Sequence, residues 1–411
     1  MKRRWLTRAG AAAALLVAAA VAWPQEAPTA AAPTAAPAPV QQAAPAVATA
    51  APETSWDLGG SLFSQPYAVY AGTWPFDNGD VSYGSATTLS LDLRARGAHA
   101  RAEASVEASL LTGAAAALAW AVARDPVFGR PDELLVPAPP TAPVPAVPPA
   151  ALFALRVRTL YLKLDPGWAA LTLGRQVVNY GRGALWSPTD IFTELDLTGL
   201  SPVRLGTDAA RLTVPLGSTA AVDAVAAPTL APADGQYALR VGGLVGDVDG
   251  AVMAARDGRG KGWVVGGDFK ADIVVGIYGE AVYELLDSGL AGVFRGAAGA
   301  DWSFDNFIVA AEYYYNSGGA DADPLFPGAH NVYFSLTWTP TELVQCAALT
   351  FVDVSDGTGT VTVLTAVSVA QNATLKVFLQ GGNSPTGLGI GTGGDVSTWV
   401  LQAGLNVEVK F

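Results

Sequence analysis

The sequence predicts an all-β fold: a transmembrane antiparallel β-barrel of about 18 strands (about 16 are also acceptable) with long extracellular loops. Three observations predict this fold. Residues 399–411 place an apolar side chain at every odd position and end on Phe411. The N-terminus has the features of a secretion signal. Finally, 51% of the residues are hydrophobic and only 15% are charged, yet no second apolar stretch is long enough for a membrane-spanning helix. A barrel accounts for this composition because only one face of each strand has to be apolar.

The first 55 residues are predicted to lie outside the barrel. Residues 1–22 form a signal peptide with a cationic start, an apolar stretch and a small-residue cleavage site at Ala20-Val21-Ala22. Its cationic residues are Lys2, Arg3, Arg4 and Arg8. Residues 23–55 form an Ala/Pro-rich leader, expected to be disordered because proline fixes φ and removes hydrogen-bond donors. The barrel is expected to comprise residues 56–411.

The net charge argues against nucleic acid as a partner, and the cysteine count excludes a disulfide within the chain. The formal charge is −12, and removal of the signal peptide, with its four cationic residues and no acidic one, changes it to −16. Nucleic acid is therefore not expected as a partner, because binding phosphate needs a basic surface. The single cysteine, Cys346, excludes a disulfide within the chain.

Within the barrel region, short turns and longer loops alternate, as expected for periplasmic turns and extracellular loops. The clearest strand is 99–110, where even positions are Ala, Val or Leu and odd positions are polar. A helix would not alternate in this way. The first strand is predicted at 56–64, and the C-terminal strands at 307–316, 331–338, 343–353, 360–370, 374–381 and 398–411. Aromatic residues near the predicted strand ends, such as Trp302 and Tyr315, fit the girdles of membrane barrels.

Two segments depart from this pattern. Thr112–Ala123 is rich in alanine, and its spacing fits a short helix in a loop or plug as well as an extension of the preceding strand. Segment 125–151 is rich in proline and is expected to be a surface loop with no constricting role.

The polar face of the strands carries charges that are expected to line a pore. Arginines are concentrated on the N-terminal half of the wall, and carboxylates on later strands. The basic residues are Arg156, Arg158, Arg211 and Arg240, and the acidic residues are Glu280, Glu284 and Glu312. Two interpretations are open. The groups could face each other across the lumen and create a transverse field that selects solutes by charge, or the charges could simply pair with and solvate each other.

Segment 177–206 is a long loop and is therefore expected to be functional. Its candidate residues are Arg182, Trp186, Asp190, Glu194 and Asp196. The preferred interpretation is that it folds inward and constricts the channel, and the alternative is an external lid.

The sequence contains no recognisable pattern of catalytic or metal-binding residues. The two histidines, His99 and His330, are predicted at opposite ends of the barrel, and neither has the spacing of a Ser/His pair or a metal site. The sequence therefore predicts neither an enzyme nor a metal or cofactor site.

One segment resembles a known group of proteins. The stretch Leu171-Thr-Leu-Gly-Arg-Gln-Val-Val-Asn-Tyr-Gly-Arg-Gly, followed by Trp186-Ser-Pro-Thr-Asp-Ile-Phe, is similar to Gram-negative alginate-export-like porins and related uncharacterised barrels. The resemblance covers residues 156–211 and implies that Arg175, Arg182 and Asp190 are pore-loop residues. Arg175 occupies a position of its strand whose side chain is predicted to face lipid. A charged side chain is not expected to face the hydrocarbon, so Arg175 is predicted to lie beyond the membrane edge.

These observations predict an outer-membrane porin for the passive diffusion of small hydrophilic solutes. A plugged structural or adhesive surface protein is the alternative. The expected partners are outer-membrane lipid, small solutes and the barrel-assembly machinery, and a homo-oligomer remains open. The assembly machinery is expected to recognise the C-terminal residues Val407, Val409 and Phe411.

Overall fold

The computed structural model describes residues 54–73, 77–123, 134–136, 149–192, 206–229, 231–258, 262–287, 292–319, 323, 326, 328–355, 357–383 and 398–411. The predicted signal peptide and residues 23–53 of the predicted leader lie outside these residues, whereas the last residue of the predicted leader, Ser55, belongs to the first strand.

Strands make up most of the described chain. The N-terminal half contains β1 (Ser55–Thr73), β2 (Asp77–Arg96), β3 (Ala100–Gly113), α2 (Ala114–Val122), β4 (Leu134–Val136), β5 (Ala151–Leu164), β6 (Ala170–Gln176), β7 (Thr207–Leu216), β8 (Ala220–Ala227) and η1 (Pro232–Asp234). The remainder contains β9 (Gln236–Val245), β10 (Val248–Asp257), β11 (Gly262–Asp272), β12 (Gly276–Leu286), β13 (Val293–Phe304), β14 (Phe307–Asn316), β15 (His330–Thr341), β16 (Val344–Asp353), β17 (Thr358–Ala370), β18 (Ala373–Asn383) and β19 (Thr398–Lys410).

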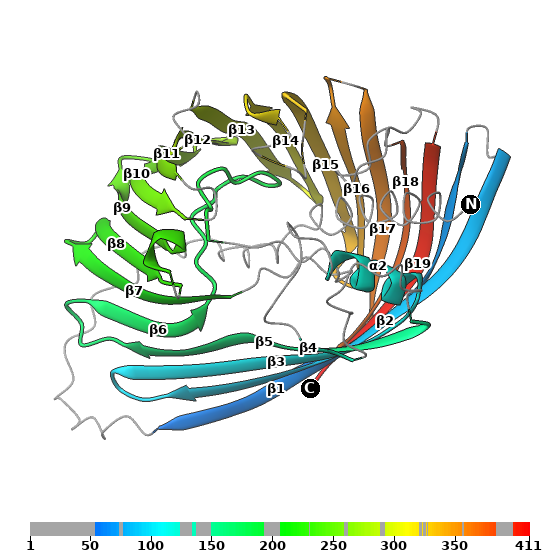
Figure 1. Cartoon of the computed structure of the whole chain (residues 1–411), viewed down its shortest axis with the longest axis horizontal. Coiled ribbons are helices and arrows are strands. Elements are labelled where there is room, and N and C mark those ends of the chain that lie inside the picture. Colours follow the sequence, from blue (N-terminus) through cyan, green and yellow to red (C-terminus); the bar gives the residue numbers. More distant parts are fainter. Residues whose placement is uncertain are drawn as a thin grey trace.

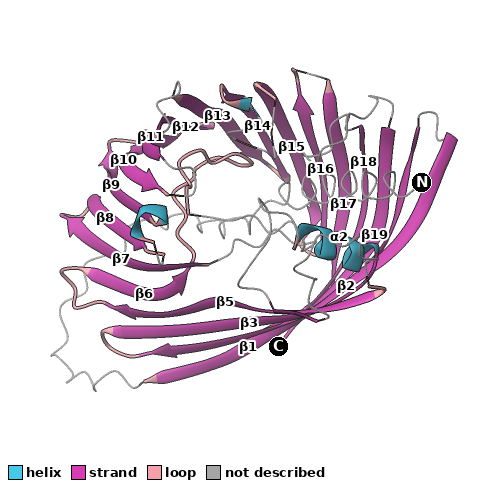
Figure 2. Cartoon of the chain, in the orientation of Figure 1, coloured by secondary structure: helices cyan, strands magenta, loops and turns pink. Residues whose placement is uncertain are grey.

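The sheet closes on itself, which confirms the predicted barrel. Each long strand pairs antiparallel with its sequence neighbours, and β1 pairs with both β2 and β19 (Figure 1). Eighteen strands form the closed ring and β4 is one extra strand. Because β3 pairs directly with β5, the short strand β4 only adds to the free edge of β5 at residues 153–155. Figure 2 shows that helices contribute little to the structure.

The two ends of the barrel differ in their connections. Short turns lie at the same end as Ser55 and Phe411, for example Asp305-Asn306 between β13 and β14. Asp305 has a positive φ of 46°, which short polar residues tolerate in tight turns. The longer connections, including those around α2 and after β6, start from strand ends at the opposite end.

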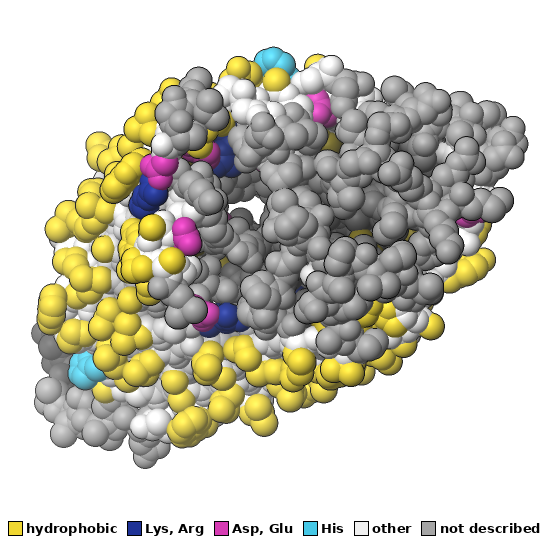
Figure 3. Space-filling model, in the orientation of Figure 1, with side chains coloured by type: hydrophobic (Ala, Val, Ile, Leu, Met, Phe, Trp, Pro, Cys, Tyr) yellow, Lys and Arg dark blue, Asp and Glu magenta, His cyan; other side chains and the backbone are white. Residues whose placement is uncertain are grey.

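Side chains alternate between the two faces of the wall as the sequence predicts. On β3, Val106 and Leu110 are exposed on the outside, whereas Ser105 and Glu107 are buried on the inside. Figure 3 shows hydrophobic side chains along the left and lower parts of the outer contour. An exterior of this kind fits contact with lipid hydrocarbon better than contact with water. Among the described residues, no helix is long and apolar enough to cross a membrane.

Aromatic side chains on the outside gather at the turn end. The rings of Trp302, Phe304, Phe307 and Trp338 form a continuous row, with successive ring centroids 4.5, 5.4 and 6.1 Å apart. Such a row has the composition of an aromatic girdle at a membrane–water interface.

The inner face is not uniformly polar. At the loop end, inward side chains such as Tyr67, Leu111 and Leu152 form an apolar cluster with α2. Figure 1 shows α2 on the inner side of the strands. The alanine-rich run 112–123 is therefore mostly helix rather than an extended strand. The prediction for 125–151 was wrong in one respect, because this segment contributes β4, whose Leu135 joins the same cluster.

Candidate functional site

The segment after β6 enters the barrel. Residues 177–192, which we call the inner loop, contact inward side chains of β10, β11, β12 and β14 and therefore lie inside the ring of strands (Figure 1). The loop contains three of the predicted residues, Arg182, Trp186 and Asp190. The other two, Glu194 and Asp196, lie outside the described residues.

Apolar contacts fix one side of the inner loop. The Trp186 indole is buried and stacks on Tyr314, with ring centroids 5.3 Å apart and an interplanar angle of 12°. It also meets the edges of Phe326 and Tyr333, at 5.5 and 6.4 Å. Aromatic pairs in these arrangements stabilise contacts beyond the burial of area alone. Trp186 therefore connects the loop to β14 and β15.

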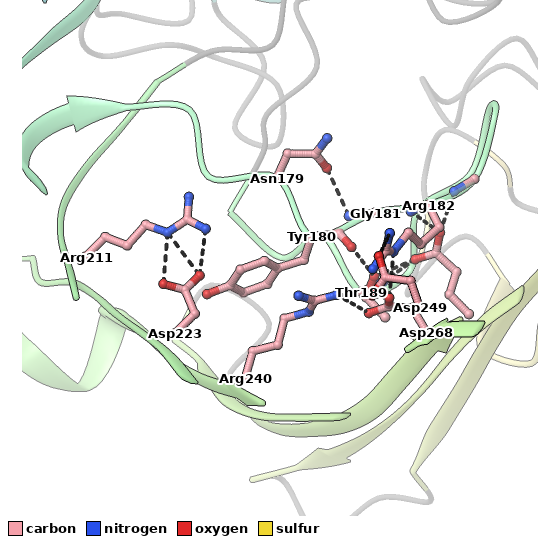
Figure 4. Close-up of polar contacts among 12 residues, drawn as sticks. Asn179, Tyr180, Gly181, Arg182, Thr189, Arg211, Asp223, Arg240, Asp249 and Asp268 are labelled. Atoms are coloured by element: carbon pink, nitrogen blue, oxygen red, sulfur yellow. Dashed lines mark hydrogen bonds and ion pairs between the residues drawn. The ribbon is translucent and has the colours of Figure 1, made fainter. Parts of the chain in front are cut away.

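Polar contacts fix the tip of the loop. The Arg182 guanidinium lies 2.7 Å from Asp249 on β10 and 2.9 Å from Asp268 on β11 (Figure 4). Asp268 also accepts two hydrogen bonds from Arg240 on β9, both at 2.9 Å. A single buried carboxylate therefore links the loop arginine to a wall arginine, and each of these charges is compensated as burial requires.

Tyr180 lies between two wall arginines. Its ring centroid is 5.3 Å from the Arg240 guanidinium carbon and 5.9 Å from that of Arg211, both within cation–π range (Figure 4). Burial raises the pKa of the Tyr180 phenol above its ordinary value, so the ring remains neutral. Arg211 in turn pairs with Asp223 on β8 at 2.7 Å.

These side chains border a cavity between the inner loop and the turn end of the barrel. Its volume is about 390 Å³. The charged residues in its lining are Arg182, Arg211, Arg240, Asp223 and Asp249. The remaining lining comes largely from the turn between β7 and β8 and from glycines of β9. The site is therefore a polar chamber in the lumen, with three cations and two carboxylates at its surface.

The other predicted wall residues also have partners. Arg156 and Arg158 on β5 share Glu107 of β3, at 2.5 and 3.2 Å. Glu284 of β12 pairs with Arg295 of β13. Glu280 and Glu312 lie beneath the inner loop and accept hydrogen bonds from it. The four predicted arginines and Glu284 thus have ion-pair partners close by, whereas Glu280 and Glu312 are satisfied by neutral hydrogen-bond donors.

The remaining predicted residues are placed as follows. The backbone N–H of Asp190 donates to the Ser187 carbonyl oxygen at 2.9 Å within the inner loop. Arg175 pairs with Asp208 of β7 at 2.6 Å and donates to the Val157 carbonyl oxygen, at the edge of β5 that β6 leaves open. Val407 and Phe411 are exposed on the closing strand, and Val409 pairs with Leu62 of β1.

Sequence reasoning missed Tyr180, Asp249 and Asp268. The two aspartates alternate with outward apolar neighbours on β10 and β11, so the same period-two pattern could have identified them as inward residues. For Tyr180 no periodic signal exists, because it lies in a loop. Within the described part of the chain, no group of three or more His, Cys, Asp or Glu side chains is placed to hold a metal ion.

Comparison with known proteins finds similarity in structure alone. No protein-family model matches the chain, and no curated protein matches its sequence. Among solved structures, it resembles Pseudomonas aeruginosa OccK5 (OpdH), with a TM-score of 0.54, 8% identity, and coverage of 86% of this chain and 98% of that chain. It also resembles Pseudomonas aeruginosa OpdK with vanillate, with a TM-score of 0.52, 8% identity, and coverage of 86% and 99%. For the outer membrane protein OprD from Pseudomonas aeruginosa, the TM-score is 0.51 at 8% identity, with coverage of 86% and 94%. The chain therefore has the barrel fold of these outer-membrane proteins.

Proposed function

We propose that this protein is an outer-membrane porin through which small hydrophilic solutes diffuse passively. The observation that carries the proposal is the inner loop, which crosses part of the lumen above a cavity lined by arginines and aspartates. A closed barrel with an apolar exterior and a charged interior separates lipid from an aqueous path. The inner loop would then narrow that path, and the cavity would select solutes by size and polarity.

Several narrower features belong to the same proposal. The apolar exterior supports residence in the outer membrane in contact with its lipid. The predicted charges Arg156, Arg158, Arg211, Arg240, Glu280, Glu284 and Glu312 would shape the field of the channel through paired groups rather than through two free walls. We expect no chemical step. The narrower resemblance to alginate-export-like porins rests only on residues 156–211 and remains a prediction. Both a monomer and a homo-oligomer are compatible with this function.

A second candidate is a plugged structural or adhesive surface protein. The observation that favours it is that α2 and the inner loop both lie inside the ring of strands. Both candidates require the same fold, so only a measurement of transport separates them.

The decisive experiment is to insert the purified full-length protein into planar bilayers and to measure single-channel currents. The porin proposal expects discrete conductance steps, together with swelling of proteoliposomes in small sugars that decreases as the sugar becomes larger. Protein with intact sheet content that produces neither current nor swelling would contradict the porin and favour the plugged barrel.

A further inference from the structure

Two wall carboxylates are hidden from the lumen. Glu280 on β12 and Glu312 on β14 are only 4% and 2% exposed. A passing solute therefore cannot reach their oxygens while the inner loop is in place. Their role has to follow from what they contact, and the contacts come mainly from the backbone of the inner loop.

Glu280 accepts four hydrogen bonds from the loop. One carboxylate oxygen accepts from the backbone N–H groups of Arg182 and Gly183, at 3.0 and 2.8 Å. The other accepts from the backbone N–H and the hydroxyl of Thr189, at 3.1 and 2.5 Å. This single side chain thus holds both ends of segment 182–189.

Glu312 binds the middle of the same segment. One oxygen accepts from the backbone N–H of Trp186 at 2.7 Å. The other accepts from the backbone N–H of Ala184 at 2.5 Å and, more weakly, from that of Leu185 at 3.4 Å. The Tyr278 hydroxyl donates to this second oxygen at 2.8 Å and orients the carboxylate from the wall side.

The chemistry of the two carboxylates suits this task. Backbone N–H groups in a buried loop have no strand partner, and leaving them unpaired is costly. An ionised carboxylate only accepts hydrogen bonds and offers about four acceptor positions, which matches the four donors at each glutamate. The turn is tight as well, because a Cβ at Gly183 would lie 1.8 Å from the Trp186 carbonyl oxygen. The loop therefore has a backbone shape made to enclose two fixed carboxylates.

We propose that Glu280 and Glu312 are positioning residues: they hold segment 182–189 of the inner loop across the lumen and thereby set the width of the channel. The anchoring itself is independent of what the barrel transports. Its consequence for conductance rests on the proposed function.

The test is backbone amide hydrogen exchange on the full-length protein in detergent micelles, for wild type, Glu280→Gln and Glu312→Gln. Gln keeps the volume of the side chain but replaces one acceptor oxygen by a donor. Loss of Glu280 is expected to accelerate exchange at Arg182, Gly183 and Thr189, and loss of Glu312 at Ala184 and Trp186. Each increase is expected to be about tenfold or more, as for loss of a hydrogen bond to a charged acceptor. Strand amides are expected to be unchanged.

Glu284→Gln is the matched control, because Glu284 lies on the same strand and lumen face but pairs with Arg295. It is expected to leave exchange in the loop at the wild-type rate. Thr189→Val approaches the contact from the loop side: it removes one donor to Glu280 without altering the wall, and is expected to accelerate exchange at residues 182 and 183. This variant carries the test if the glutamate variants do not fold.

Two results would overturn the proposal: unchanged loop exchange in folded Glu280→Gln or Thr189→Val protein, or equal acceleration in Glu284→Gln. Single-channel recording of the same variants separates this inference from the proposed function. Increased conductance in Glu280→Gln and Glu312→Gln supports both. The predicted exchange pattern in a protein without any current supports the anchoring and rejects the porin.

Discussion

At the level of single residues, arginines that share one carboxylate can differ in how much charge they present to the lumen. Arg156 and Arg158 both contact Glu107. Arg156 lies closer to the carboxylate and its side chain is 13% exposed, whereas the side chain of Arg158 is 33% exposed. Water screens the more exposed group, yet its charge remains accessible to ions. Arg158 should therefore contribute more to ion selectivity than the less exposed Arg156.

We predict that Arg158→Gln shifts the reversal potential toward cation preference while Arg156 still compensates Glu107. A unit charge about 4 Å from an ion contributes about 1 kcal/mol in water, so the permeability ratio should change by no more than about fivefold. The measurement is reversal potential in a salt gradient. Arg256→Gln is the control, since Arg256 pairs with Asp287 and contacts Trp263 on the outer face. Equal shifts in both variants would count against a local effect of Arg158.

The sequence could predict which charges face inward but not which charges pair. Alternation at period two fixes the face of a side chain, as it did for Arg240 and Glu280. Pairing depends on the register between strands, which brings Asp223 opposite Arg240 on one side and Thr213 on the other. Contacts of the inner loop with Asp249 and Asp268 depend in addition on the path of a segment with no periodic pattern.

At the level of elements, the strands were predicted well where alternation is unbroken and poorly where it is not. Strand β14 has the predicted limits, 307–316. By contrast, β1 extends from Ser55 to Thr73, well beyond the predicted 56–64. Its continuation contains Pro66, and a proline is typical of a strand end because it cannot donate to a strand ladder. The alanine-rich sequence of α2 is compatible with the periodicity of a helix and with that of a strand. Contacts inside the barrel decide between the two.

We predict that Ala119→Asp detaches α2 from the wall without unfolding the barrel. Ala119 is buried against the apolar inner cluster that contains Leu111 and Leu152, so an unpaired carboxylate there should cost about 3 to 5 kcal/mol. The helix is not part of the sheet, and the strands should therefore persist. Increased single-channel conductance with unchanged sheet content is the expected result. Ala117→Asp is the control at a half-buried position of the same helix, and a similar increase there would argue against a specific contact.

At the level of the whole molecule, the even strand number of the ring places the start of β1 and the end of β19 at the same end of the barrel. The β1–β19 pairing closes the barrel, and its last contacts are two backbone hydrogen bonds between Gly60 and Phe411, at 2.9 and 3.0 Å. The Phe411 ring lies against Gly60, where a Cβ would approach it to 2.8 Å, and is itself exposed on the outside. Phe411 therefore takes part in the closure through its backbone, and its exposed ring is available to a partner.

The sequence predicts that the barrel-assembly machinery recognises Val407, Val409 and Phe411, and the exposed ring of Phe411 allows this prediction to be tested. Phe411→Ala keeps both backbone hydrogen bonds, so the purified variant should refold in detergent with wild-type sheet content. In cells, the amount of folded protein in the outer membrane should decrease several-fold, because the machinery would lose the aromatic terminus. The control is Phe269→Ala, which removes an exposed outer-face ring on β11 far from the terminus in sequence. If Phe411→Ala impairs refolding in detergent as strongly as assembly in cells, the ring stabilises the barrel itself and is not a recognition signal.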